Sequence, residues 1–192
     1  MNSLFTILIG SIFTSNMVLT HYLGLCPFFG ASKKWGGAIG LSLASLILLP
    51  LSIILTYALN VFIIQPLQVE YLSLVLLMVS IVLLIQLFTT LSEKLIPTVH
   101  AIASPYYPLF SMNALTLGVG LTVLGANFSF VEVLGYAFGA PLGFAVVVLI
   151  FTSIRERIIL HDRVPLPFKG SAIAFIITSF IAMAFMAFTG IL

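Results

Sequence analysis

Long apolar runs make up most of this chain, and charged residues occur only between these runs or at their ends. A helix that crosses a membrane needs about 20 consecutive, mostly apolar residues. Runs of that kind predict spans at 4–22, 38–60, 70–91, 104–124, 131–153 and 171–191. Apolar and polar residues do not alternate within runs such as Leu46–Leu49, which disfavours a membrane β-barrel. The pattern therefore predicts an all-α polytopic membrane protein with six transmembrane helices.

Composition narrows the class of protein further. Hydrophobic residues make up 61% of the 192 residues and charged residues only 6%, whereas about a quarter of the residues in soluble domains are charged. Soluble enzymes, nucleic-acid-binding proteins and disordered scaffolds are therefore excluded, and we expect a single transmembrane domain over 1–192. The net charge of +2 indicates no strongly charged macromolecular partner. No Lys or Arg precedes the first apolar run, so we expect no cleaved signal peptide.

The basic residues predict the orientation in the membrane. All seven lie in the first, third or fifth connection between predicted spans: Lys33, Lys34, Lys94, Arg155, Arg157, Arg163 and Lys169. The second and fourth connections carry Glu70 and Glu132 and no cation. Because connections rich in Lys and Arg stay in the cytoplasm, both termini are predicted to lie outside.

An internal repeat is indicated by one short motif. The pattern Gly-x-Ala-x-Gly occurs at Gly36–Gly40 and at Gly135–Gly139, which are 99 residues apart. Each copy opens the middle helix of a three-span half, one about 1–96 and the other about 97–192. Because three is odd, the two halves would have inverted topology. The alternative is chance, since small residues are common in membrane helices.

The first helix of each half is predicted to be broken. Residues 4–32 contain no Asp, Glu, Lys or Arg and are too many for one straight crossing, and Leu23–Pro27 interrupts them with Gly and Pro. In the second half, Pro105 and Pro108 precede Asn113. Irregular backbone at membrane depth requires cover by protein or a water-filled cavity. Two corresponding breaks therefore favour a functional site between the halves, and two ordinary kinked helices are the alternative.

Several motifs together resemble a known family. They are Asn16–Leu19, Leu23–Lys34, Pro108–Asn113, Arg155–Arg157, Val164–Gly170 and Ala184–Gly190. In this combination they resemble the membrane subunits of the Rnf/Nqr family, and among these the A-type subunits of the Rnf branch. The resemblance covers nearly the whole chain.

The resemblance implies a place in a larger assembly. Subunits of this family have six helices and pair with a homologous sister subunit of opposite topology, here of the E type. The complex couples electron transfer between NADH and ferredoxin to Na⁺ or H⁺ movement across the prokaryotic inner membrane, and other Rnf subunits carry flavin and iron–sulfur centres. The predicted outside position of both termini agrees with the A-type subunits.

The resemblance also implies a cofactor. In paired family subunits, cysteines from both chains hold an iron–sulfur cluster within the membrane, which makes Cys26 the ligand of a shared [2Fe–2S] cluster. The family's second cysteine falls on Ala114 and its membrane-embedded glutamate on Thr89. Four thiolates usually hold such a cluster, so a substitute ligand from the partner is needed, or the cluster is absent.

Single residues allow simpler interpretations as well. Free cysteine often behaves as a small buried hydrophobe, which is the alternative for Cys26. His21 does not share a helix face with Cys26 and is predicted to be a helix-end polar residue. Asn16 and Asn113 are expected either to satisfy broken backbone or neighbouring helices, or to line an ion or electron path. The charged residues between Arg155 and Lys169 are expected to form a solvated cytoplasmic loop, with docking of a redox subunit as the alternative.

These features favour a membrane subunit of an ion-translocating oxidoreductase complex with no complete active site, and no catalytic residue, of its own. No Gly-rich nucleotide loop follows a strand, so neither flavin nor nicotinamide is expected to bind directly. The alternatives are a scaffold paralogue without a cluster and a small secondary transporter that works alone.

Overall fold

The computed structural model describes residues 2–14, 16–32, 35–67, 70–95, 97–111, 113–125, 128–160 and 170–187. Within these ranges the regular structure is helical throughout. The predicted all-α class is therefore correct for the described part of the chain.

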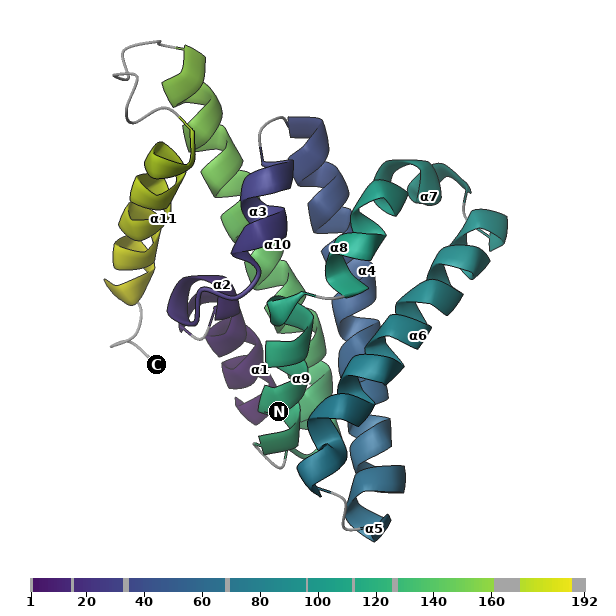
Figure 1. The fold of residues 1–192 in the computed structure, drawn as a ribbon. Helices are drawn as coiled ribbons and strands as arrows, with labels where there is room; N and C mark the ends of the chain where they lie inside the picture. The colour runs from purple at the N-terminus through teal and green to yellow at the C-terminus, as the bar shows by residue number, and fades with distance from the viewer. Residues whose placement is uncertain are drawn as a thin grey trace.

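Two long helices form the centre of the molecule. They are α4 (Trp35–Leu59), which continues as the π-helix η2 (Asn60–Ile64), and α10 (Phe130–Leu160). These two helices pack against each other more extensively than any other pair (Figure 1). Leu48 on α4 and Val147 on α10 are fully buried. Both helices are apolar on nearly all sides because each is surrounded by other helices and lipid rather than by water.

Two further helices flank this central pair on opposite sides (Figure 1). They are α6 (Ser73–Leu95), joined to η2 through α5 (Gln65–Leu67) and η3 (Glu70–Leu72), and α11 (Ser171–Met186). Large apolar side chains such as Leu87 on α6 and Phe180 on α11 remain exposed. Such surfaces are stable in lipid, which is as apolar as the side chains themselves.

The remaining elements are short pieces of two broken segments. The first consists of α1 (Asn2–Ile9), the π-helix η1 (Gly10–Thr14), α2 (Met17–Thr20) and α3 (Leu25–Ala31). The second consists of α7 (Pro97–Ala103), η4 (Ser104–Tyr106), α8 (Tyr107–Ser111) and α9 (Ala114–Gly125). Elements α1 and η1 pack mainly on α10, whereas α7 to α9 pack on α4 and α6.

Glycines of the repeated motif allow these contacts. A Cβ atom at Gly40 of α4 would lie 2.9 Å from Ile102 O, and one at Gly139 of α10 would lie 3.0 Å from Leu8 O. Each glycine therefore admits the backbone of the broken segment from the other half of the chain, which is the use of small residues expected between membrane helices.

The structure supports part of the predicted span count. Within the described residues, three helices are long and apolar enough to cross a membrane: Trp35–Ile64, Ser73–Lys94 and Phe130–Ile158. They match the predicted spans 38–60, 70–91 and 131–153. The pair His100–Ser111 and Ala114–Gly125 is bent by 64° and matches 104–124 as one broken span, while Ser171–Met186 is shorter. Six spans therefore remain a prediction.

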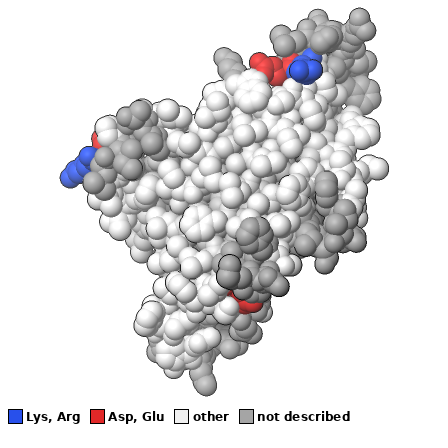
Figure 2. Space-filling view, turned by 180° about the vertical axis from the view of Figure 1, so that it is seen from behind, with Lys and Arg blue, Asp and Glu red and all other residues white. Residues whose placement is uncertain are grey.

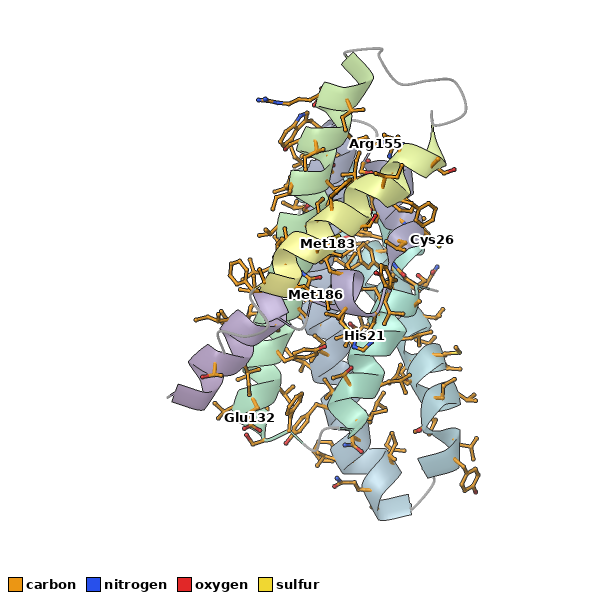
Figure 3. The ribbon with its side chains drawn as sticks, turned by 90° about the vertical axis from the view of Figure 1, so that its left-hand side faces the viewer. His21, Cys26, Glu132, Arg155, Met183 and Met186 are labelled. Carbon is orange, nitrogen blue, oxygen red and sulfur yellow. The ribbon has the colours of Figure 1, made fainter. Side chains whose placement is uncertain are left out.

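Charge is distributed unequally between the two ends of the molecule. Figure 2 shows the basic residues of the described part only toward its upper end, whereas the lower end displays acidic colour alone. In Figure 3, Arg155 and Glu132 lie toward opposite ends of α10. Lys33, Lys34, Arg163 and Lys169 lie outside the described residues.

Candidate functional site

The first broken segment changes direction twice. Between α2 and α3, Tyr22 and Gly24 adopt positive φ angles of 56° and 85°. This turn lies at the predicted interruption, while Cys26 and Pro27 belong to the first turn of α3, where the missing proline N–H costs little. The other interruption precedes α2, at Asn16, and was not predicted.

The side chain of Asn16 forms hydrogen bonds with the backbone on both sides of that interruption. It is buried, and its Oδ1 accepts a hydrogen bond from Val18 N at 3.1 Å while its Nδ2 donates to Ile12 O at 3.1 Å. The side chain thereby caps α2 and satisfies a carbonyl of the preceding π-helix. In lipid, where water cannot do this, such a cap replaces a backbone bond.

Asn113 occupies the corresponding place in the second broken segment. Pro105 lies in η4 and Pro108 in α8, and the 64° bend follows them. The Asn113 Oδ1 accepts a hydrogen bond from Leu115 N at 3.1 Å, so it caps α9 as Asn16 caps α2. Its buried Nδ2 has no hydrogen-bond partner among the described residues. The structure thus places both predicted asparagines at breaks.

The two broken segments touch each other. A Cβ atom at Gly24 would lie 3.0 Å from the Cβ of Leu115, and one at Gly118 of α9 would collide with Leu23. Gly24 also has a left-handed conformation, which disfavours any residue with a side chain. The glycines therefore let the turn before α3 lie directly on α9.

This contact determines where Cys26 and Ala114, the position of the family's second cysteine, lie. Cys26 follows Gly24 by two residues, and Ala114 immediately precedes Leu115. Both side chains are exposed at the surface of the described chain. The thiol is therefore accessible to a neighbouring protein in the membrane.

The donor set of this chain is too small for a complete cluster. Nowhere in the described ranges do three His, Cys, Asp or Glu residues gather to hold a metal ion. Ala114 has no ligand atom, and the Thr89 hydroxyl donates within α6 to Ile85 O at 2.7 Å. A [2Fe–2S] cluster usually needs four thiolates. This chain has one cysteine and can supply only one of them. An arrangement in which each of two subunits supplies two thiolates is therefore excluded.

Arg155 holds the far end of the helix that carries Cys26. The side chain is only 7% exposed, and its Nη1 donates to Phe29 O at 3.0 Å and to Ser32 Oγ at 3.1 Å. The guanidinium also lies 5.9 Å from the ring centroid of Phe151, within the range of a cation–π interaction. In Figure 3, Cys26 lies between Arg155 and His21 along the length of the molecule.

The prediction that Arg155 belongs to a solvated loop is therefore wrong. Helix α10 continues to Leu160, so Arg155 follows Phe151 by one helical turn on the same buried face. The spacing of four residues between Phe151 and Arg155, which is that of one face of a helix, was the signal in the sequence that could have revealed this contact. Most of the predicted loop, 161–169, lies outside the described residues.

Aromatic side chains surround α3 near Arg155. The rings of Phe28 and Phe151 are 4.5 Å apart, and those of Phe29 and Phe175 are 4.8 Å apart. These contacts join α3 to α10 and α11 and exclude water from one side of the helix. His21, in contrast, is the exposed C-cap residue of α2, in agreement with its predicted position at a helix end.

The chain is similar in sequence to a family of membrane proteins over nearly its whole length. The family model described as "Rnf-Nqr subunit, membrane protein" matches residues 4–192. The chain is 40% identical to an Aliivibrio fischeri protein named as the A-type subunit of an ion-translocating oxidoreductase complex, over 96% of this chain and 95% of the relative. Proteins of the same name from Vibrio vulnificus and Shewanella denitrificans are 40% and 39% identical, over 96% and 97% of this chain and 96% of each relative.

Proposed function

The chain belongs to the Rnf-Nqr family of membrane proteins, and we propose that it is the A-type membrane subunit of an ion-translocating oxidoreductase complex. In that complex, electron transfer between NADH and ferredoxin would be coupled to Na⁺ or H⁺ movement. The similarity to relatives of that name extends over almost their full length, which supports the same role here.

One observation carries the chemical part of the proposal. The two broken segments meet at Gly24 and Leu115 and leave Cys26 exposed beside this contact. We propose Cys26 as one thiolate ligand of a [2Fe–2S] cluster shared with a homologous sister subunit of the E type. Because Ala114 offers no donor atom, the sister subunit would supply the remaining ligands.

The residues around Cys26 would orient and shield the ligand. Arg155 anchors the C-terminal end of α3, and the Phe28–Phe151 contact keeps water from its inner side. A cluster at this position would accept and release single electrons. The rigid attachment of α3 would keep the thiol at a fixed place in the interface with the partner.

The proposal includes the arrangement in the bacterial inner membrane. We propose six spans in two inverted halves, with both termini outside. The similar caps formed by Asn16 and Asn113 support the repeat, as does the packing of each broken segment on the other half's long helix. The basic residues at one end support the orientation, because the cytoplasmic side retains cations.

The proposed partners can be tested in the native host. We expect the tagged chain, purified in mild detergent, to bring with it a homologous membrane protein together with redox subunits that carry flavin and iron–sulfur centres. Inverted vesicles from cells that lack the chain should lose ion uptake driven by electron transfer from reduced ferredoxin to NAD⁺, and the gene should restore it.

A different result would identify another function. Purification of the chain without other subunits, together with solute uptake by the isolated chain in liposomes, would overturn the proposal in favour of a secondary transporter. Vesicles that retain redox-driven uptake without this chain would also overturn it.

A further inference from the structure

A cavity of about 370 Å³ lies beside the first broken segment. Its walls come from the first broken segment, the end of α9 and the beginning of α10, and its lining includes Thr6, Ser11, His21, Thr122 and Tyr136. Thr6 and His21 are exposed, so the cavity opens to the surface there. Because a single water needs on the order of 15 Å³, the space admits a group of waters or a hydrated ion.

Two hydroxyl groups on the walls are oriented by the backbone. Ser11 Oγ donates to Leu8 O at 3.0 Å, and Thr122 Oγ1 donates to Gly118 O at 2.9 Å. A hydroxyl has one proton and two acceptor lone pairs. Since both protons are used on backbone carbonyls, each oxygen offers only lone pairs to an occupant of the cavity.

The hydroxyl of Tyr136 lacks a partner of its own. Tyr136 is only 4% exposed, and its hydroxyl makes no hydrogen bond within the described part of the chain. The neighbouring Thr122 hydroxyl donates to Gly118 O, so toward Tyr136 it can act only as an acceptor. A buried hydroxyl without a partner costs free energy unless water or a ligand satisfies it. A water in the cavity would satisfy this hydroxyl more fully than the Thr122 oxygen, which is the acceptor nearest to it.

The electrostatics of the cavity favour cations. Thr122 belongs to the last turn of α9, where the free carbonyls carry partial negative charge. Among the described residues that line the cavity there is neither Lys nor Arg. The described lining also contains hydroxyl and imidazole groups rather than the charged oxygen ligands that a tightly held divalent ion prefers.

We infer that this cavity is a hydrated vestibule that admits monovalent cations from the end of the molecule that carries Glu132. The vestibule reaches His21, five residues before Cys26, so a cation in it would approach the turn that leads to α3. Its use for the coupling ion rests on the proposed function, whereas its hydration and its preference for cations do not.

Cysteine accessibility tests the vestibule directly. In the native assembly on open membrane sheets, Thr122→Cys should react with the cationic reagent MTSET about tenfold faster than with the anionic MTSES, after each rate is normalised to that with free cysteine. Modification at position 122 is read by peptide mass spectrometry with Cys26 left in place. Phe138→Cys is the matched control: this residue is 56% exposed on α10, two residues from Tyr136, and a thiol facing lipid should not react.

A second variant tests whether the cavity itself provides access. Gly10 lines the vestibule, and a Cβ atom there would meet open space. Gly10→Leu should fill the cavity and slow modification of Thr122→Cys several-fold. Gly36→Leu places the same side chain in open space at the beginning of α4 and should leave the rate unchanged.

The possible outcomes separate this inference from the proposed function. If Thr122→Cys is as unreactive as Phe138→Cys, if MTSES reacts as fast as MTSET, or if Gly10→Leu has no effect, the vestibule is overturned. Cation-selective labelling in an assembly that moves no ions would uphold the vestibule and contradict the coupling role.

Discussion

Replacement of Cys26 by alanine is expected to lower ion uptake driven by reduced ferredoxin and NAD⁺ in inverted vesicles by about tenfold or more, because a cluster cannot form without its ligands. Cys26 is the only cysteine of the chain, so no other thiol of this protein can replace it. Its exposure means that alanine leaves no buried cavity, and the assembly should retain all its subunits. The measurement is the initial rate of uptake per purified complex.

Thr90→Ala is the matched control for this variant. Thr90 is also exposed, and its hydroxyl donates only within α6, to Gln86 O at 3.1 Å. Uptake should therefore be unchanged. If the Cys26 variant were as active as the Thr90 variant, the chain would not carry a cluster ligand, and a scaffold role in the complex would explain its presence.

Replacement of Arg155 by methionine is expected to have the largest effect on stability. The change removes the donors to Phe29 O, which is partly buried, and to Ser32 Oγ, which is fully buried. We expect a loss of about 3 kcal/mol, which is typical when one partner of a buried, charged hydrogen-bonded group is removed. Thermal unfolding of the purified assembly should therefore occur at a lower temperature.

The same variant should also release α3 from α10. The rate at which N-ethylmaleimide modifies Cys26 should rise, because the helix that carries the thiol is no longer fixed at its C-terminal end. Arg155→Lys should be intermediate, since one ammonium group cannot reproduce the guanidinium geometry. Ile154→Met alters an exposed apolar side chain of the same helix and should change neither quantity much. An unchanged Cys26 reaction rate in the Arg155 variants would show that this contact does not position α3.

The sequence predicts the long helices well because their apolar runs are long and uniform. The predicted span 38–60 falls within α4 and its continuation η2, and 131–153 falls within α10, but both helical segments extend further at their ends. At the C-terminal end of α10 charged residues caused this difference, because Arg155 is predicted to lie in a loop although the buried face of the helix includes it. Hydropathy alone does not separate a buried arginine with two acceptors from a solvated one.

The candidate site is predictable only in part. Gly24, Pro105 and Pro108 locate the breaks, because these residues favour backbone that departs from a helix. The interruption at Asn16 and the π-helix before it have no comparable signal in the sequence. The meeting of Leu23 and Gly24 with α9 also escapes prediction, since it depends on tertiary contacts between residues about 90 positions apart in the chain.

The electron paramagnetic resonance spectrum of the reduced native assembly tests the central claim most directly. The claim is that Cys26, held beside the contact between the two broken segments, ligates a [2Fe–2S] cluster shared with a neighbouring protein. We predict a [2Fe–2S] signal in the wild-type assembly that disappears in Cys26→Ala while the composition of the assembly stays the same. An identical spectrum in both assemblies would contradict the account.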